Sequence, residues 1–179
     1  MKGPPARGEI RIGVSACLLG RPVRWDGGHK KDAFVTGPLA RLVTLAPLCP
    51  EVEVGMGTPR EPVRLVRRGG EVRMVGGRSG TDHTGAMRRW AEARARALES
   101  EDLCGFVLKQ DSPSCGLRRV EVDAGGRAAR SGRGLFAEAL LARLPLLPVE
   151  EEGRLEDPRL RENFVERVFA YRRLKGFLA

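Results

Sequence analysis

Three cysteines of this chain lie in short turns that are rich in glycine, proline or serine. Cys17 lies in SACLLG, Cys49 in LCPEVEVG and Cys115 in SPSCG. Glycine and proline permit the sharp bends that bring a backbone close to a ligand, whereas a cysteine that only packs in a core is expected within an apolar run. Three thiolates from distant parts of one chain are suitable ligands for an iron–sulfur cluster or another soft metal. The three turns are therefore candidates for such a site.

The spacing of the cysteines leaves more than one interpretation open. Cys49 follows Cys17 by 32 residues and Cys115 follows Cys49 by 66, which is neither a zinc-ribbon pair of CxxC motifs nor a ferredoxin run. The alternative interpretation is that these cysteines are ordinary buried thiols that bind no metal. The fourth cysteine, Cys104, precedes the apolar GFVL and is expected to be a core thiol. If Cys104 were a fourth ligand, the metal would have no open position for a substrate, which would argue against catalysis. The alternative function is therefore a structural zinc-binding or RNA-binding module that uses four cysteines.

Two carboxylates follow Cys49 closely. Glu51 is a candidate to orient or deprotonate a water molecule at a metal, and its structural alternative is capping of a turn or an ion pair with Arg60. Arg60 is in turn a candidate to bind a substrate phosphate. Glu53 is the second candidate for this catalytic role. It lies on the face opposite to Glu51 if the segment is not extended, and on the same face if it is.

Polar side chains also precede Cys115. The hydroxyls of Ser112 and Ser114 can hydrogen-bond a cluster, a substrate or a water molecule, and the alternative is that they satisfy the backbone of the turn. Lys109 is a candidate to hold a substrate carbonyl or to stabilise negative charge, with a surface lysine as the alternative.

Two glycine-containing loops are weaker candidates. WDGGHK, with Asp26, His29 and Lys30, is interpreted as a loop over the site and a candidate substrate lid, and its histidine as solvent-exposed rather than as a ligand. GGRSG at 76–80 lacks a full glycine-rich phosphate-binding fingerprint, so we interpret it as a connection.

Composition limits the classes of protein that this chain can represent. The formal net charge is +9 over 179 residues, which leaves RNA and anionic substrates open as partners. Asn163 and Gln110 are the only side-chain amides, which is typical of a thermophile-like protein that relies on surface ion pairs. No apolar run approaches the roughly 20 residues that span a bilayer, and the N-terminus has no signal-peptide pattern. We therefore expect a cytoplasmic protein with free thiols, and self-association is left open.

The elements that must position these residues are predicted from periodicity. Ile10, Ile12 and Val14 alternate and predict a strand over 9–16, and runs on both sides of Gly69-Gly70 predict a β-hairpin. Thr84 is expected to cap a helix, and Asp157-Pro158 to begin a C-terminal amphipathic helix. The remaining expected helices lie over 33–45 and 135–143. A strand or extended stretch is expected around 48–54, strands over 105–108 and 144–149, and a strand with a turn in VEVDAGG at 120–126.

Helices that alternate with short apolar strands predict an α/β fold, a three-layer sandwich around a mostly parallel sheet. Sites in such folds form beyond the carboxyl ends of the strands, and Cys17 and Cys115 both follow predicted strands. The expected organisation is a flexible tail at 1–8, an α/β domain at 9–149, and a linker with the C-terminal helix at 150–179.

Four motifs occur in a fixed order: SACLLG-x-x-VRWDGGHK, CPEVEVGMGTPREPVRL, GTDHT and LKQDSPSCG. In this order they resemble the 2-thiouracil desulfidase family, over roughly residues 9 to 149. The C-terminal RENFVERVFAYRRLKGF resembles the opening of a second domain that some relatives carry, and we expect that domain to be absent here.

The resemblance implies a 4Fe–4S cluster held by Cys17, Cys49 and Cys115, with one iron open to substrate. It implies a non-redox desulfidase in which water attacks a thiocarbonyl carbon and sulfur leaves as sulfide. The implied substrate is a thiolated pyrimidine base, nucleoside or nucleotide. The resemblance also favours Ser112 near the active site. Together with the chemistry of the residues given above, we expect Glu51 and Ser112 to act on the water and the substrate, and Lys109 to assist them.

Overall fold

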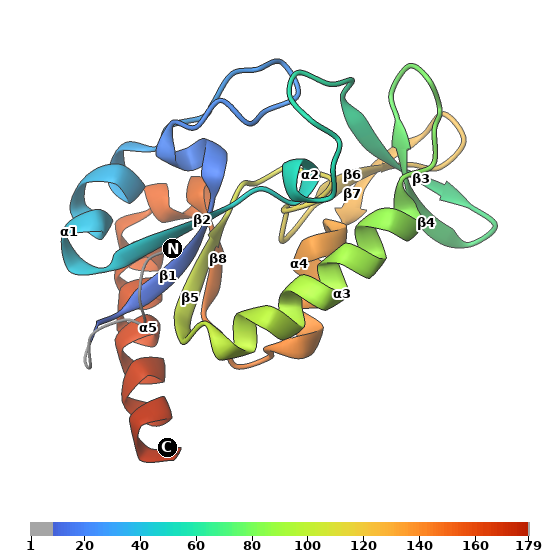
Figure 1. The fold of residues 1–179 in the computed structure, drawn as a ribbon. Helices are drawn as coiled ribbons and strands as arrows, with labels where there is room; N and C mark the ends of the chain where they lie inside the picture. The colour runs from blue at the N-terminus through green and yellow to red at the C-terminus, as the bar shows by residue number, and fades with distance from the viewer. Residues whose placement is uncertain (1–8, 179) are drawn as a thin grey trace.

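The structure, a computed structural model, describes residues 9–178 (Figure 1). The predicted tail at 1–8 lies outside the described residues. Four parallel strands form sheet A in the order β2-β1-β5-β8. Their bounds are β1 (Arg11–Ser15), β2 (Thr44–Leu48), β5 (Leu103–Leu108) and β8 (Val149–Glu151). This sheet confirms the prediction of a mostly parallel α/β fold.

Helices cover both faces of sheet A (Figure 1). All six residues of β5 are buried, as expected for a parallel strand that is covered on both sides. Phe106 packs with Phe136 on one face, while Val107 packs with Phe164 on the other. The first layer contains α3 (Thr84–Ser100) and α4 (Leu135–Arg143); the second contains η2 (Val35–Leu39), α1 (Ala40–Leu42) and α5 (Pro158–Leu178).

A second, mixed sheet was not predicted. Sheet B has the order β4-β3-β6-β7, and β6 runs parallel to β3. The predicted hairpin is confirmed at its centre, where Gly69 and Gly70 have φ values of +57° and +83°, as a tight hairpin turn requires. The strands are β3 (Val63–Arg68), β4 (Glu71–Gly76), β6 (Val120–Asp123) and β7 (Ala128–Gly132).

Of the strand or extended stretch expected around 48–54, only Leu48 and Cys49 are extended, and the expectation is wrong from Pro50 onward. The strand β2 ends at Leu48, and α2 (Pro50–Glu53) follows. Pro50 is favoured at the first helical position, where its missing N–H costs nothing, and carboxylates are favoured in the first turn of a helix. Because the segment is helical, Cys49 lies at the junction between a strand and a short helix.

Three other boundaries also differ. The segment expected to be helical over 33–45 is helical over 33–42, and only its end differs, since Thr44 begins β2. The strand expected over 144–149 is wrong except at Val149, because Pro145 and Pro148 have no N–H to donate to a sheet. Thr84 is not the cap of α3: His83 occupies that position, and the Thr84 hydroxyl accepts the Met74 N–H at 2.8 Å.

The predicted C-terminal helix is confirmed as α5. Asp157 Oδ1 accepts the Arg159 N–H at 2.8 Å at its start, and Phe164 and Val168 are buried against sheet A. No helix in the described part of the chain combines the length and apolar character needed to cross a membrane. Two short 3-10 helices complete the fold, η1 (Ala16–Leu19) and η3 (Glu152–Glu156).

Candidate active site

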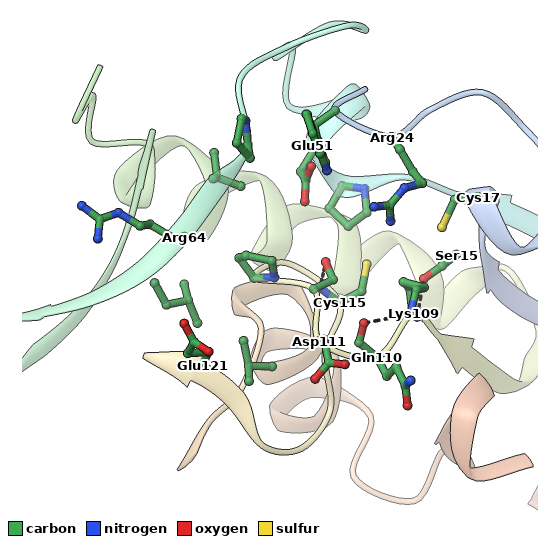
Figure 2. Close-up of a pocket in the computed structure, with 18 of the residues that line it drawn as sticks. Ser15, Cys17, Arg24, Glu51, Arg64, Lys109, Gln110, Asp111, Cys115 and Glu121 are labelled. Carbon is green, nitrogen blue, oxygen red and sulfur yellow. Dashed lines mark hydrogen bonds between the residues drawn. The ribbon is translucent and has the colours of Figure 1, made fainter. Parts of the chain in front are cut away.

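The three candidate cysteines lie at the carboxyl edge of sheet A. Cys17 follows β1 on η1, Cys49 follows β2, and Cys115 lies in the loop that leaves β5. All three line one pocket of about 650 Å³, and Figure 2 shows the thiols of Cys17 and Cys115 on its wall. The crossovers of a parallel sheet bring residues far apart in sequence to this edge.

The three thiols share a buried environment. Burial raises the pKa of Cys115 well above its ordinary value, and raises the pKa of Cys17 to about 11. Burial likewise raises the pKa of Cys49. The thiols are close enough that negative charge on Cys49 raises the pKa of both others further. Thiolates at these positions therefore need a bound cation, which holds coordinating thiols in the deprotonated form.

The turn that presents Cys115 is built by Ser112. Its Oγ accepts the N–H groups of Ser114 at 3.2 Å and of Cys115 at 3.1 Å, and its carbonyl accepts the Gly116 N–H at 2.8 Å. Ser112 also lines the pocket. The hydroxyl proton of Ser112 is not used by these bonds, so the residue combines the backbone role with a donor at the pocket wall.

Glu51 is held between two partners. Its Oε2 accepts the Arg60 Nε–H at 3.0 Å and pairs with Arg60 Nη2, and its Oε1 accepts the Ser114 hydroxyl at 2.8 Å. The second guanidinium edge of Arg60 donates to the carbonyls of Val23 and Gly57. The ion-pair alternative for Glu51 is therefore observed, and the carboxylate also lines the pocket (Figure 2). The guanidinium of Arg60 therefore donates its hydrogen bonds to acceptors within the protein.

Lys109 is not a free surface lysine. Its Nζ pairs with Glu152 and donates to the Gln110 carbonyl at 3.1 Å. Its backbone N–H donates to Ser15 Oγ at 2.9 Å, the bond drawn in Figure 2. The side chain lines the pocket beside the cysteines.

Ser15 is a site residue that sequence reasoning missed. It is 3% exposed, its hydroxyl oxygen accepts the Lys109 N–H at 2.9 Å, and it lines the pocket. A serine at the end of an apolar strand carries no motif of its own. Its position at the carboxyl end of β1 is the only signal that points to it.

The weaker candidates are placed differently. Glu53 faces α3, where its Oε2 lies 3.4 Å from Arg94 Nε, and it does not line the pocket. His29 Nδ1 accepts the Lys31 N–H at 3.2 Å, whereas Lys30 of the same loop lines the pocket. The substrate-lid role of this loop stays a prediction.

The GGRSG connection at 76–80 is bound by a carboxylate from another segment, that of Glu61. Glu61 Oε2 accepts the N–H groups of Arg78 and Ser79 at 2.8 Å and 3.0 Å. Because these N–H groups already donate to Glu61, they are not available to bind a phosphate. The structure therefore agrees with the interpretation of GGRSG as a connection between elements.

Cys104 lies apart from the other three cysteines. It is the second residue of β5, near the start of β1, and is fully buried in the core with Val107 and Phe164. It does not line the pocket. Within residues 9–178 no three His, Cys, Asp or Glu side chains form a site for a single metal ion. Because Cys104 lies outside the pocket that the other three cysteines line, the alternative of a four-cysteine zinc site is not favoured.

Comparison with known protein families agrees with this geometry. The family model for 2-thiouracil desulfurase matches residues 12–152, a span that contains the three pocket cysteines. The chain belongs to the 2-thiouracil desulfurase family. The resemblance inferred from the motifs is thereby confirmed.

A solved structure and a protein of Bacillus subtilis are both similar to this 2-thiouracil desulfurase chain. A solved structure described as the [4Fe-4S]-dependent thiouracil desulfidase TudS is 35% identical, with a TM-score of 0.64. The similarity covers 87% of this chain and 99% of that one. The uncharacterized protein YbbK of Bacillus subtilis (strain 168) is 31% identical over 108 residues, which are 58% of this chain and 71% of YbbK.

Proposed function

We propose that this protein is an iron–sulfur-dependent desulfidase that converts the C=S group of a thiolated pyrimidine to C=O and releases sulfide. The observation that carries the proposal is the convergence of Cys17, Cys49 and Cys115 on one pocket at the carboxyl edge of sheet A. Membership of the 2-thiouracil desulfurase family and the similarity to TudS support the same reaction class.

The donor set fits a 4Fe–4S cluster. In such a cluster each thiolate binds a different iron, so three cysteines would leave one iron without a protein ligand. Cys17, Cys49 and Cys115 would hold the cluster, and their buried thiols would be deprotonated by its positive charge. When bound, the cluster supplies a Lewis acid that binds the sulfur of the substrate.

The remaining candidates act on water and substrate. Glu51 lies on the pocket wall with its position fixed by Arg60 and Ser114, so it would orient the attacking water and accept its proton. Ser112 would donate its hydroxyl hydrogen to substrate or water. Lys109 would stabilise negative charge that develops on the pyrimidine.

The wall of the pocket supports a substrate that carries an anionic group. The volume of about 650 Å³ would be shared by the cluster and the substrate, so the lining residues are the better guide to the substrate class. The outer wall of the pocket comes from sheet B and includes Arg64 and Arg130. We therefore include thiolated nucleosides and nucleotides, as well as the free base, among the substrates.

The test is sulfide release by anaerobically reconstituted protein. Wild type should release sulfide from thiouracil or a thiouridine compound and form the oxygen analogue in equal amount. Cys115→Ser should lose both the cluster absorbance and the sulfide release. Full desulfidase activity in Cys115→Ser would refute the assignment.

A cytoplasmic location, RNA binding and self-association stay predictions. All four cysteines are free thiols, which agrees with a reducing compartment. Gel filtration addresses self-association. A steep dependence of RNA affinity on salt concentration would reveal a nucleic-acid-binding role.

A further inference from the structure

Three consecutive glutamates lie at the junction between β8 and η3, and all three are buried. Glu150 is 5% exposed, Glu151 4% and Glu152 9%. A buried carboxylate costs free energy unless it is paired or hydrogen-bonded. The hydrogen-bond and ion-pair partners of each glutamate therefore show which parts of the structure this segment stabilises.

Glu152 contacts the beginning of the loop that carries the candidate site. Its Oε1 pairs with Lys109 Nζ, and its Oε2 accepts the Gln110 N–H at 2.7 Å. The neighbouring backbone fits closely, because a Cβ at Gly153 would lie 2.1 Å from Gln110 Oε1. The start of η3 is therefore packed directly against the start of this loop.

Glu151 contacts the end of the same loop. Its Oε1 accepts the N–H groups of Leu117 at 2.8 Å and Arg118 at 3.2 Å. Glu150 instead pairs with Arg154 on η3 at 2.9 Å and accepts the Glu151 N–H at 3.1 Å. Two adjacent carboxylates thus hold the two ends of the segment 109–118, which contains Ser112 and Cys115.

Lys109 connects this arrangement to the pocket. It lines the pocket, and its positive charge lowers the pKa of the Cys17 thiol, whereas the charge of Glu152 raises it. A lysine ammonium has three N–H donors. Glu152 and the Gln110 carbonyl take two of them, which leaves one for a molecule in the pocket.

We propose that Glu152 is a positioning residue for the desulfidase reaction, which acts by fixing Lys109 Nζ at the pocket wall. The proposal rests on the proposed function. Glu152 itself does not line the pocket, whereas Lys109 does. We therefore assign its effect on catalysis to Lys109, and the double-mutant cycle below separates this route from the bond of Glu152 to the Gln110 N–H.

The test compares Glu152→Gln with Glu150→Gln. Both remove the charge from a buried carboxylate of the same segment, but only the first releases Lys109. We expect Glu152→Gln to keep the iron and acid-labile sulfide content of wild type and to lose between about tenfold and 100-fold in kcat/KM, as misplaced catalytic groups do. Glu150→Gln should stay within about twofold of wild type. Equal losses in the two variants would overturn the proposal.

A double-mutant cycle tests whether Glu152 acts through Lys109. In a Lys109→Met background, the further change Glu152→Gln should have no additional effect on kcat/KM. A second loss as large as the first would contradict the proposal. If Glu152→Gln does not fold, Glu152→Asp, which keeps the charge on a shorter side chain, replaces it in the same cycle.

Amine labelling of the cluster-free protein gives a readout that is independent of activity. The rate at which acetic anhydride modifies Lys109, measured by peptide mass spectrometry, should rise several-fold in Glu152→Gln and not in Glu150→Gln. An unchanged rate would overturn the positioning role. If wild type released no sulfide from any thiolated pyrimidine, the proposed function would fail, and the labelling rate would still decide whether Glu152 fixes Lys109.

Discussion

Glu51 and Arg60 form the most enclosed ion pair of the candidate site. The Arg60 side chain is 7% exposed and the Glu51 side chain 14%. The guanidinium also donates to the Gly57 carbonyl at 2.7 Å, so its donors are used by the protein. Arg60 therefore holds the Glu51 carboxylate and is not available for a substrate phosphate.

We predict that Arg60→Met lowers the free energy of unfolding by about 1–3 kcal/mol, because it leaves a half-buried carboxylate without its charged partner. Urea denaturation of the cluster-free protein measures this. Arg64→Met is the matched control: Arg64 pairs with Asp123 at 2.8 Å, but the arginine side chain is 53% exposed. Its loss should cost about 0–1 kcal/mol.

The double variant Arg60→Met/Glu51→Met completes this test. Because it removes both charges, it should be more stable than the sum of the two single changes implies. Strict additivity would contradict a direct interaction between Arg60 and Glu51.

At this scale, the sequence predicted the residues with recognisable chemistry. Cys17, Cys49 and Cys115 were found because each lies in a turn, and Glu51 because it follows one of them. Ser15 and Glu152 carry no such signal. Their roles depend on contacts across 94 and 43 positions of the chain, and only the folded sheet brings these partners together.

Among the elements, the strands and helices with clear periodicity were predicted well, but the ends of several of them were not. The helix over 135–143 agrees with α4, and the hairpin agrees with β3 and β4. The extended stretch expected after Cys49 was wrong. The apolar residues Leu48, Val52 and Val54 allow a strand, whereas Pro50 favours the start of a helix. Sheet B was missed because the pairing of β6 with β3 is not local in sequence.

Glu61 stabilises the connection after β4 in a pH-dependent way. Hydrogen bonds from Ser79 and Arg78 lower the pKa of Glu61 from its ordinary value of 4.5 to about 2. A lowered pKa in the folded state means that the stabilisation is complete above about pH 4.5 and is lost as the pH falls towards 2.

We therefore predict that Glu61→Gln lowers the melting temperature at pH 7, and that its difference from wild type shrinks between about pH 4.5 and pH 2. Thermal unfolding followed by circular dichroism across this range measures the effect. Glu71→Gln, a glutamate of the same hairpin with a 63% exposed side chain, should show little difference at either pH. A pH-independent deficit in Glu61→Gln would be inconsistent with these hydrogen bonds.

At the scale of the whole molecule, α5 completes the second layer of the sandwich. The family match ends at residue 152, and α5 begins at Pro158. A Cβ at Gly105 of β5 would lie 2.8 Å from Val168 Cγ2, so the helix packs closely on sheet A. The C-terminal helix was predicted because its apolar residues recur at helical spacing. The thermophile-like character stays a prediction.

Phe164 should anchor α5 to the sheet. It is fully buried, whereas Phe177 on the same helix is 87% exposed. We predict that Phe164→Ala lowers the free energy of unfolding by about 3–5 kcal/mol, and that Phe177→Ala changes it by less than about 0.5 kcal/mol. Chemical denaturation measures both. Similar losses in the two variants would mean that α5 does not pack as described.

The central claim is that three of the four cysteines hold one cluster at the carboxyl edge of sheet A. Iron and acid-labile sulfide per chain, measured after anaerobic reconstitution of four single Cys→Ala variants, test it most directly. We expect the changes at Cys17, Cys49 and Cys115 each to abolish stable cluster binding, and Cys104→Ala to retain the wild-type content. Full iron content in any of the first three variants, or its loss in a folded Cys104→Ala, would contradict the account.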